Sequence, residues 1–318
     1  MPFVKEKFFI EEESLAFVYL MREFNLTQGE SQRLIARGRL IIDGESMVLS
    51  NKRIQGEVEI VYFKPSSRGL KPIFSTSDFM LFDKPSGVLV HPKKMTTPYS
   101  MLDEVRSFAG QNANGCHRID METSGLFLAS SNKVSEKDIK MLFQEREIKK
   151  SYLAWVDGEF KDECLVDEPI LTLPVGYEES KHKVVISPKG KNAQTFFKPL
   201  HYNRDLDSTL LACYPHTGRT HQIRVHLFHM KHPIIGDPIY GTDFDISNQY
   251  LEENLTLEKR EIYTGAKRLL LHANSLRFVY KDNKYILYSK EDFRDAKALI
   301  EPIKNRKFNK RNIDEKSL

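Results

Sequence analysis

The chain has 318 residues, 40% of them hydrophobic and 29% charged, and this composition predicts a globular protein with room for two domains. No stretch approaches the roughly 18 uninterrupted apolar residues of a membrane span, and the start MPFVKEKFFIEEE is too acidic for a secretory or transit peptide, so we expect a cytoplasmic protein. The net charge of +4 does not by itself require a nucleic-acid partner, and the 3 cysteines are odd in number and far apart, which argues against a disulfide framework and a zinc site.

Residues 14–63 are predicted to form a small unit of helices and strands. The stretch SLAFVYLMREFNL has apolar residues at near-helical spacing, and a second helix, ESQRLIARG, ends at its glycine. The dipeptide Asp43-Gly44 then predicts a hairpin turn, and EVEIVYF alternates as a strand. Because Arg33 and Arg37 are four residues apart, they share one face of the second helix.

This segment resembles an S-four-like RNA-binding module, which is a helix pair followed by a hairpin. The resemblance rests on SQRLIARGRLIIDGE and QGEVEIVYF, although the first helix begins with acidic residues where such modules usually carry basic ones. It implies that residues 1–65 bind RNA and that Arg33 and Arg37 are RNA-binding residues. The alternative, a small domain with a purely structural role, stays open.

A larger domain is predicted over residues 78–303, after a linker at 66–77 where KPSSRGLKP combines Pro, Ser and Gly. Strands are predicted at FMLF, GLFLASS, KSYLAWVDGEF, TFFKPL, STLLACYP, LLLHANSLRFVY and KYILYS. SEKDIKMLFQEREI is predicted to be a helix that opens with a capping box of Ser135 and Asp138. Many strands with few helices favour an α+β fold with a mixed, largely antiparallel sheet. The lysine-rich end, 304–318, is predicted to be a disordered tail.

Several sequence blocks of the larger domain carry a family resemblance. HRIDMETSG, FDKPSGVLVHP and HTGRTHQIRVHLFHMKHPIIGDPIYG, together with KKSYLAWVDG, are similar in order and spacing to the RluA-type pseudouridine synthase family. The resemblance covers roughly residues 78–303. It implies the pseudouridine synthase fold and a cofactor-independent isomerase that converts uridine in RNA to pseudouridine. The Pro and Gly of the FDKPSG block are expected to shape the cleft instead of contacting substrate.

This conversion sets a chemical requirement. The bond from the sugar to the base nitrogen must break, the uracil must rotate, and the base must rejoin the sugar through carbon, with no net hydrolysis or redox change. A carboxylate near the anomeric carbon can attack it as a nucleophile or stabilise the positive charge that develops there. Asp120 in HRID matches the family's catalytic aspartate, and the sequence leaves both roles open.

Two further catalytic residues follow from the resemblance. A buried carboxylate stays ionised when a cation lies close to it, and Arg224 in HQIRVH matches the family position for this cation. Arg219 is the alternative cation, and phosphate contact is the competing interpretation of both arginines. Tyr152 in KKSYLAWV matches the tyrosine that stacks on the target uracil, and its hydroxyl could take part in proton transfer.

RNA-binding residues are predicted beside the catalytic ones. A paired target base must be flipped out of its helix, and Arg118 matches the family arginine that fills the resulting gap. A surface salt bridge between Arg118 and Glu122 is the alternative. His117 and Arg219 are also predicted to be RNA-binding, because local clusters of basic residues supply the salt-sensitive part of RNA binding.

No metal and no cofactor are expected. Four histidines, His221, His226, His229 and His232, lie close together in the sequence, but no HExxH pattern or cysteine pair accompanies them.

Two rival classes of protein stay open. A retaining glycosidase or nucleosidase needs a second carboxylate about 5 to 5.5 Å from the first, and Glu122, two residues after Asp120, is the candidate in the sequence. A non-catalytic RNA-binding or ribosome-assembly protein has no need of Asp120, Tyr152 and Arg224 together. The favoured RNA is ribosomal RNA of the large subunit, with transfer RNA as the alternative, and neither a membrane nor an obligatory protein partner is predicted.

Overall fold

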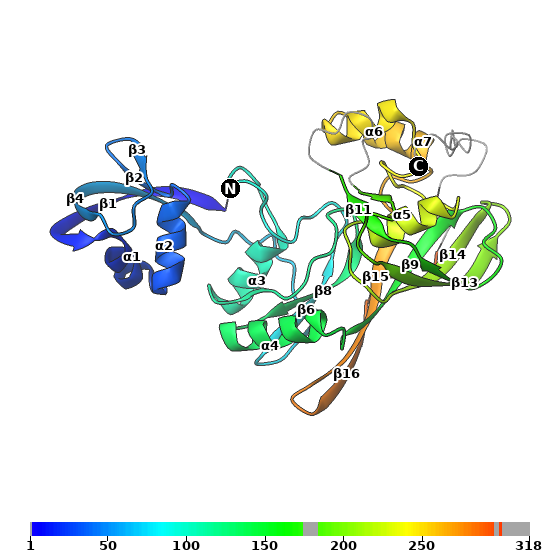
Figure 1. The fold of residues 1–318 in the computed structure, drawn as a ribbon, viewed down its shortest axis with the longest axis horizontal. Coiled ribbons are helices and arrows are strands. Elements are labelled where there is room, and N and C mark those ends of the chain that lie inside the picture. Colours follow the sequence, from blue (N-terminus) through cyan, green and yellow to red (C-terminus); the bar gives the residue numbers. More distant parts are fainter. Residues whose placement is uncertain (1, 174–183, 296–298, 301–318) are drawn as a thin grey trace.

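The computed structural model describes residues 2–173, 184–295 and 299–300 and contains two units, each built on its own sheet (Figure 1). The predicted tail at 304–318 lies outside the described residues. In the described part of the chain, no helix is long and apolar enough to cross a membrane.

The N-terminal unit combines two helices with a four-stranded sheet in the order β1-β4-β2-β3. Its elements are β1 (Phe3–Leu15), α1 (Ala16–Phe24), α2 (Gln28–Ala36), β2 (Leu40–Ile42), β3 (Glu45–Met47) and β4 (Arg53–Phe63). Strand β1 does not follow from the sequence, because lysines and glutamates obscure its alternation. In the sheet these charges face the partner strand, where Lys5 and Lys7 pair with Glu59 and Glu57.

The segment between the two units is anchored to the helix α3 (Met101–Ala109). The backbone N–H of Ser66 donates to Asp103 at 3.0 Å, and that of Arg68 donates to Glu104 at 2.6 Å. Both carboxylates are buried in the first turn of α3, where the helix dipole favours negative charge. The connection between the units is therefore fixed to the larger unit by hydrogen bonds.

The larger unit is an α+β domain with a ten-stranded sheet in the order β10-β13-β14-β9-β15-β8-β6-β5, with β16 paired to β15 and β7 to β8. Its strands are β5 (Phe74–Ser75), β6 (Phe79–Lys84), β7 (Asn114–Gly115), β8 (Ser124–Ser130), β9 (Lys149–Asp157), β10 (Cys164–Asp167), β13 (Gln194–Asn203), β14 (Ser208–Pro215), β15 (Leu271–Tyr280) and β16 (Asn283–Tyr288). Among the described strands only β8 and β15 pair in parallel, so the predicted mixed, largely antiparallel sheet is confirmed.

Short elements cover the sheet and extend it. They are a small sheet of β11 (Ile170–Thr172) and β12 (Val184–Ile186), and the helices α4 (Lys133–Gln144), α5 (Gln222–His229), α6 (Phe244–Leu251) and α7 (Leu257–Thr264). The capping box predicted for α4 is wrong. The helix begins at Lys133, and the side chain of Asn132 accepts hydrogen bonds from the backbone N–H groups of Val134 and Ser135, because Asn132 is the extended residue just before the first turn.

The order of the central strands brings distant segments together. Strand β15 lies between β8 and β9, so the loop that precedes β8 meets the side chains of β9. The approach of β8 to β15 is close at Gly125, which has φ of +96° and would place a Cβ atom 2.3 Å from the carbonyl oxygen of Ala273. No side chain fits between the two strands at this point.

We expect Gly125→Ala to lower the free energy of unfolding by about 3 kcal/mol, because both the positive φ and the backbone contact oppose a Cβ atom. Chemical denaturation followed by circular dichroism would measure the change. The matched control is Gly29→Ala in α2, where the new Cβ would meet only the flexible tip of Arg33 at 3.4 Å. The control should be neutral or stabilising by up to about 1 kcal/mol. Equal stability of Gly125→Ala and the wild type would contradict the close approach.

Candidate active site

Asp120 lies in the loop between β7 and β8, and the buried Lys84 helps to hold this loop. The Lys84 Nζ donates to the carbonyl oxygens of Met121, Pro85 and Val88 at 2.9, 2.9 and 2.8 Å. Burial lowers the pKa of Lys84 to about 7. Its three partners are all acceptors, so the ammonium form with three N–H donors satisfies them best. The turn that begins at Lys84 thus supports the loop from below instead of contacting the cavity.

Arg224 connects Asp120 to a second, fully buried carboxylate. Its Nε and Nη2 donate to Asp237 at 2.7 and 2.8 Å, while its Nη1 lies 3.5 Å from Asp120 Oδ2. Burial alone would lower the pKa of Arg224, but the charges of Asp237 and Asp120 raise it above its ordinary value. Burial would likewise raise the pKa of Asp237, but the charge of Arg224 lowers it. Both members of this pair are therefore ionised.

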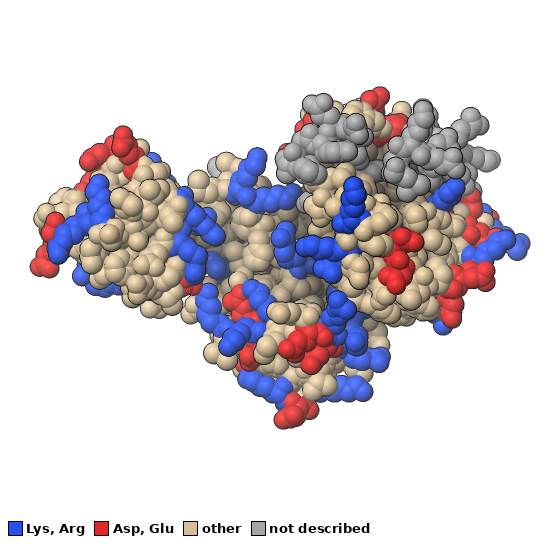
Figure 2. All heavy atoms as spheres, viewed as in Figure 1, with Lys and Arg blue, Asp and Glu red and all other residues tan. Residues whose placement is uncertain are grey.

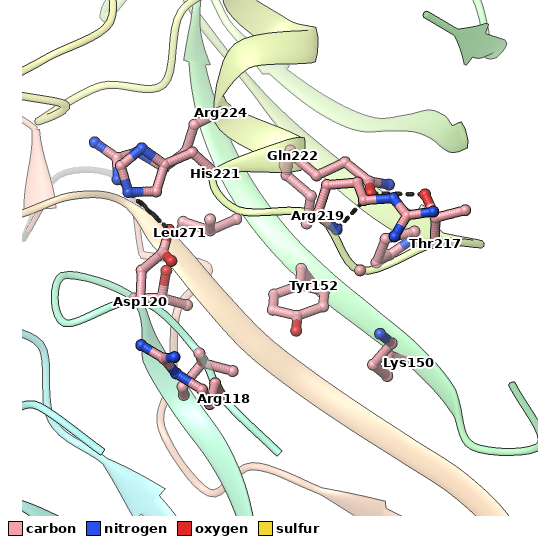
Figure 3. Close-up of a pocket in the computed structure, with 15 residues that line it drawn as sticks. Arg118, Asp120, Lys150, Tyr152, Thr217, Arg219, His221, Gln222, Arg224 and Leu271 are labelled. Carbon is pink, nitrogen blue, oxygen red and sulfur yellow. Dashed lines mark hydrogen bonds and ion pairs between the residues drawn. The ribbon is translucent and has the colours of Figure 1, made fainter. Parts of the chain in front are cut away.

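His221 also faces Asp120 from the start of α5. Its Nε2 lies 3.8 Å from Asp120 Oδ2, and its Nδ1 lies 3.0 Å from the hydroxyl of Tyr240. Figure 3 shows the side chains of Arg224 and His221 together over the Asp120 carboxylate. His221 has φ of +52°, a left-handed conformation that is uncommon for a residue with a side chain and that often marks functional sites.

Tyr152 lies on β9 and borders the same cavity as Asp120 (Figure 3). Burial, and then the charge of Asp120, raise the pKa of Tyr152 well above its ordinary value. The phenol is therefore protonated at neutral pH. Its ring offers a flat apolar surface within the cavity, and its hydroxyl is close enough to Asp120 for electrostatic coupling.

The cavity has a volume of about 100 Å³ and a mixed polar and apolar lining. Asp120 is the one Asp or Glu among its described lining residues. A second catalytic carboxylate, which a retaining glycosidase needs, is therefore absent from the described wall. This finding counts against that rival.

A neighbouring groove of about 620 Å³ is strongly basic. Its wall contains Arg118, Arg146, Lys149, Lys150 and Arg219 and, in the described part of the chain, no Asp or Glu. Three of these residues, Arg118, Lys150 and Arg219, also line the cavity of Asp120, so the groove and the cavity share one mouth. Figure 2 shows a hollow in the centre of the molecule with Lys and Arg at its rim.

The structure places the predicted RNA-binding residues in three locations. Arg118 and Arg219 lie at the shared mouth, and Arg219 donates through Nε to a backbone carbonyl instead of contacting Asp120. His117 borders only the groove. Arg33 and Arg37 lie in the N-terminal unit and line a different cavity.

His117 is held in place by contacts within the protein. Its Nε2 accepts the backbone N–H of Leu128 at 2.9 Å, and its ring stacks on Phe143 with the centroids 4.5 Å apart. Burial, and then the charge of Lys150, lower the pKa of His117 to about 3, so the ring is neutral. Any contact of His117 with RNA is therefore uncharged.

Glu122 is held by two residues that the sequence gives no reason to select. Its carboxylate accepts from Arg260 Nη2 at 2.7 Å and from the Tyr250 hydroxyl at 2.9 Å. Arg260 Nη2 also donates to the carbonyl of Gly236, which directly precedes Asp237. Glu122 thus pairs with Arg260 and not with Arg118, the alternative partner considered from the sequence. The helices α6 and α7 thereby brace both the loop of Asp120 and the turn that holds Arg224.

Two further histidines near α5 have partners of their own in the protein. The ring nitrogens of His226 lie 3.0 Å from both the Thr195 hydroxyl and the Glu168 carbonyl, and His232 lies 2.9 Å from the Asp157 carbonyl. Among the described residues, no group of three or more His, Cys, Asp or Glu side chains is placed to hold a metal ion.

The sequence leaves His221, Asp237 and Tyr240 without assigned roles in the site. A signal for them is present, because all three lie in the same long motif as Arg224, which ends in GDPIYG. Their contacts appear only once the chain folds back so that Asp237 meets α5. Lys150 has a similar signal, since a residue two positions from Tyr152 on a strand points to the same face.

Comparisons with known proteins agree on one family. A family model described as RNA pseudouridylate synthase matches residues 78–229. A Helicobacter pylori protein named as an uncharacterized RNA pseudouridine synthase is 40% identical over 290 residues, which cover 91% of this chain and 94% of that protein.

Two more distant relatives are named for different RNAs. The ribosomal large subunit pseudouridine synthase D of Nitrosomonas europaea is 32% identical over 243 residues, covering 74% of this chain and 66% of that protein. The mitochondrial tRNA pseudouridine(32) synthase of Saccharomyces cerevisiae is 32% identical over 248 residues, covering 76% of this chain and 53% of that protein.

Solved structures show the same fold. The structure titled human RNA pseudouridylate synthase domain containing 1 superposes with a TM-score of 0.56 at 23% identity, covering 72% of this chain and 86% of that one. This likeness extends the agreement from sequence to architecture.

We expect Arg260→Met to lower the free energy of unfolding by about 3 kcal/mol, because it leaves the buried Glu122 without its cation. The double variant with Glu122→Gln should lose less than the two single variants together, by at least about 1 kcal/mol. Urea denaturation of all four proteins would measure this coupling. Lys281→Met, which breaks an exposed ion pair with Asp78, is the control and should leave the free energy of unfolding close to that of the wild type. Strictly additive losses would show that the two residues do not interact.

Proposed function

Because the chain belongs to the RNA pseudouridine synthase family and is an isomerase acting on uridine in RNA, we propose that Asp120, Tyr152 and Arg224 form its catalytic centre. The observation that supports this assignment best is the position of Asp120. It is the one carboxylate of the described cavity wall, with Arg224 3.5 Å away and Tyr152 in the same wall.

The reaction needs these groups in defined roles. The bond between uracil N1 and sugar C1′ breaks, the uracil rotates, and a bond forms between C5 and C1′. The proton on C5 is lost, and N1 gains a proton, so the overall reaction releases none. Asp120 either attacks C1′ and is displaced again or stabilises the positive charge while the base leaves.

Arg224 keeps Asp120 in place for either role. Asp237 occupies two of the donors of Arg224, so only Nη1 is directed at Asp120. At 3.5 Å this contact supplies attraction without a tight bidentate clamp. The lone pairs of Asp120 therefore stay available to the sugar.

Tyr152 would act through its ring and its hydroxyl. The ring stacks on the uracil and holds it while it rotates, an interaction worth about 1 to 3 kcal/mol per base. Because its raised pKa keeps the hydroxyl protonated, Tyr152 can accept the C5 proton only while giving its own proton to another group. Asp120, whose charge already acts on Tyr152, is the proposed recipient, and its transfer of a proton to uracil N1 completes the balance and regenerates the carboxylate.

The basic groove would bind the RNA next to the target. Arg118 and Arg219 stand at the mouth of the cavity, where the phosphates on either side of a flipped nucleotide would pass. Arg118 has no carboxylate within 4.0 Å in the described part of the chain, so it is available to fill the gap that the uridine leaves. His117 supports this wall as a neutral ring.

We favour ribosomal RNA of the large subunit as the substrate. The relatives whose names specify an RNA include both a ribosomal large subunit enzyme and a transfer RNA enzyme. The N-terminal unit, with the predicted RNA-binding residues Arg33 and Arg37, gives the chain a second basic surface that a large folded RNA can reach. Transfer RNA is the alternative.

We expect Asp120→Asn to abolish pseudouridine formation and to leave RNA binding nearly unchanged, because the amide keeps the shape of the side chain but not its charge. Carbodiimide mapping of total RNA, from cells that lack the gene and carry either form, would reveal the sites that depend on the wild type. Asp78→Asn, at an exposed ion pair with Lys281, is the control and should restore these sites. A substrate in transfer RNA would appear in the same map, and conversion by Asp120→Asn would refute the assigned role.

We expect Tyr152→Phe to bind RNA nearly as well as the wild type but to form product at least about 10²-fold more slowly, because the ring remains and the proton relay is lost. Tyr152→Leu should weaken binding as well, since it also removes the stacking surface. Single-turnover rates with saturating enzyme would separate the two effects. A wild-type rate for Tyr152→Phe would assign the proton transfer to another group.

A further inference from the structure

A second cavity, of about 380 Å³, lies between the N-terminal unit and α3. Arginines from both units line it, with Arg33 and Arg37 from α2 and its end, Arg39 from the turn before β2, and Arg106 from α3. None of its lining residues borders the cavity of Asp120. Figure 2 shows Lys and Arg on the face of the N-terminal unit that is turned toward the rest of the molecule.

These four arginines lack acidic partners. In the described part of the chain, no Asp or Glu oxygen lies within 4.0 Å of any of them. Each of five other arginines does have such a partner, namely Arg22, Arg53, Arg224, Arg260 and Arg268. The four arginines share this lack of an acidic partner with Arg118 of the basic groove, and here they are gathered around one cavity.

Two of the four guanidinium groups are also partly removed from water. Arg39 lies 4.6 Å above the ring of Phe3, and Arg106 lies 5.2 Å above the ring of Phe63. Burial, and then the nearby charge of Arg37, lower the pKa of Arg39, and burial lowers the pKa of Arg106. The guanidinium groups of Arg37 and Arg39 thus lie close enough to repel each other, while the partly buried Arg106 lies within the influence of the more distant charges of Glu30, Glu136 and Asp103.

Glu30 is the single acid of the cavity wall, and its charge is already engaged. It accepts from Lys133 Nζ at 2.9 Å and from the backbone N–H of Thr27 at 3.0 Å. Burial alone would raise the pKa of Glu30, but these hydrogen bonds lower it to about 2. Four arginines and one glutamate leave a net positive charge at the cavity wall.

Contacts within the protein hold the walls of the cavity in place. The ion pair of Glu30 with Lys133 joins α2 to α4, and Arg106 packs on Phe63 at the end of β4. The anchored segment at Ser66 holds the units together on the same side. An anion could therefore enter without first assembling its site.

We propose that this cavity binds the phosphate backbone of the substrate RNA, at a part of the RNA distant from the target uridine. The planar forks of arginine match phosphate oxygens in a bidentate manner. Asn25, Gln111 and Asn112 add amide groups that can bond to phosphate or ribose oxygens. The identity of the ligand as RNA rests on the proposed function, and its chemical class rests on the four arginines that have no acidic partner within 4.0 Å among the described residues.

The test compares the salt dependence of RNA binding by full-length variants. Arg37→Gln and Arg106→Gln should each reduce the slope of log K against log salt by about 0.7 to 0.9 and weaken binding of a long ribosomal RNA fragment about fivefold at 0.15 M salt. A short oligonucleotide that fills only the cavity of Asp120 should bind all variants equally. Arg106→Lys, which keeps the charge, should restore most of the affinity. Arg53→Gln, on the same unit but paired with Glu13, should match the wild type.

Unchanged slopes for both Arg37→Gln and Arg106→Gln would overturn the proposal. The proposal would also be overturned if millimolar inorganic phosphate displaced the long RNA from the wild type but not from Arg37→Gln and Arg106→Gln, since that would indicate a site for the free anion. Thermal unfolding checks that each variant is folded. The outcome does not depend on catalysis, because a protein that binds RNA through these arginines but forms no pseudouridine would refute only the proposed function.

Discussion

The buried ion pair of Arg224 and Asp237 is the interaction on which the site depends. Removing two charges from water is costly, and only good geometry with further hydrogen bonds offsets this cost. Here Asp237 receives two guanidinium hydrogen bonds and the backbone N–H groups of Ile239 and Tyr240. The pair fixes the direction of Nη1 of Arg224, and Asp120 lies in that direction.

The same pair also limits how strongly Asp120 is held. Without Asp237, the whole guanidinium would be free to form a bidentate clamp on Asp120. The carboxylate oxygens would then be less available to contact a sugar. With two of its donors occupied by Asp237, Arg224 instead offers Nη1 to Asp120 at 3.5 Å. Arg224 thus attracts the proposed catalytic carboxylate without enclosing it, and Lys84 and Arg260 hold Met121 and Glu122, the two loop residues that follow Asp120.

The parts of this arrangement differ in how well the sequence predicts them. Asp120, Tyr152 and Arg224 stand in long motifs whose spacing carries the information, and the structure brings all three into one cavity. Arg260 could not be predicted, because it meets Glu122 from 138 positions away and its helix has no motif. Helix α3 does not follow from the sequence for a related reason. Its acidic residues Asp103 and Glu104 suggest a solvated surface, but in the structure they are buried against the connecting segment. Local sequence patterns reveal the periodicity of helices and strands. Contacts between residues far apart in the sequence exist only in the folded protein.

The anchoring of the connecting segment on α3 has a consequence for how the two units cooperate. A flexible tether would let the N-terminal unit sample a large volume, and the local concentration of one unit around the other would be diluted accordingly. Hydrogen bonds from Ser66 and Arg68 to the α3 carboxylates remove part of that freedom. For a molecule that contacts both units, binding at one would then raise the effective concentration at the other, and the resulting avidity would depend on the length and stiffness of this short connection.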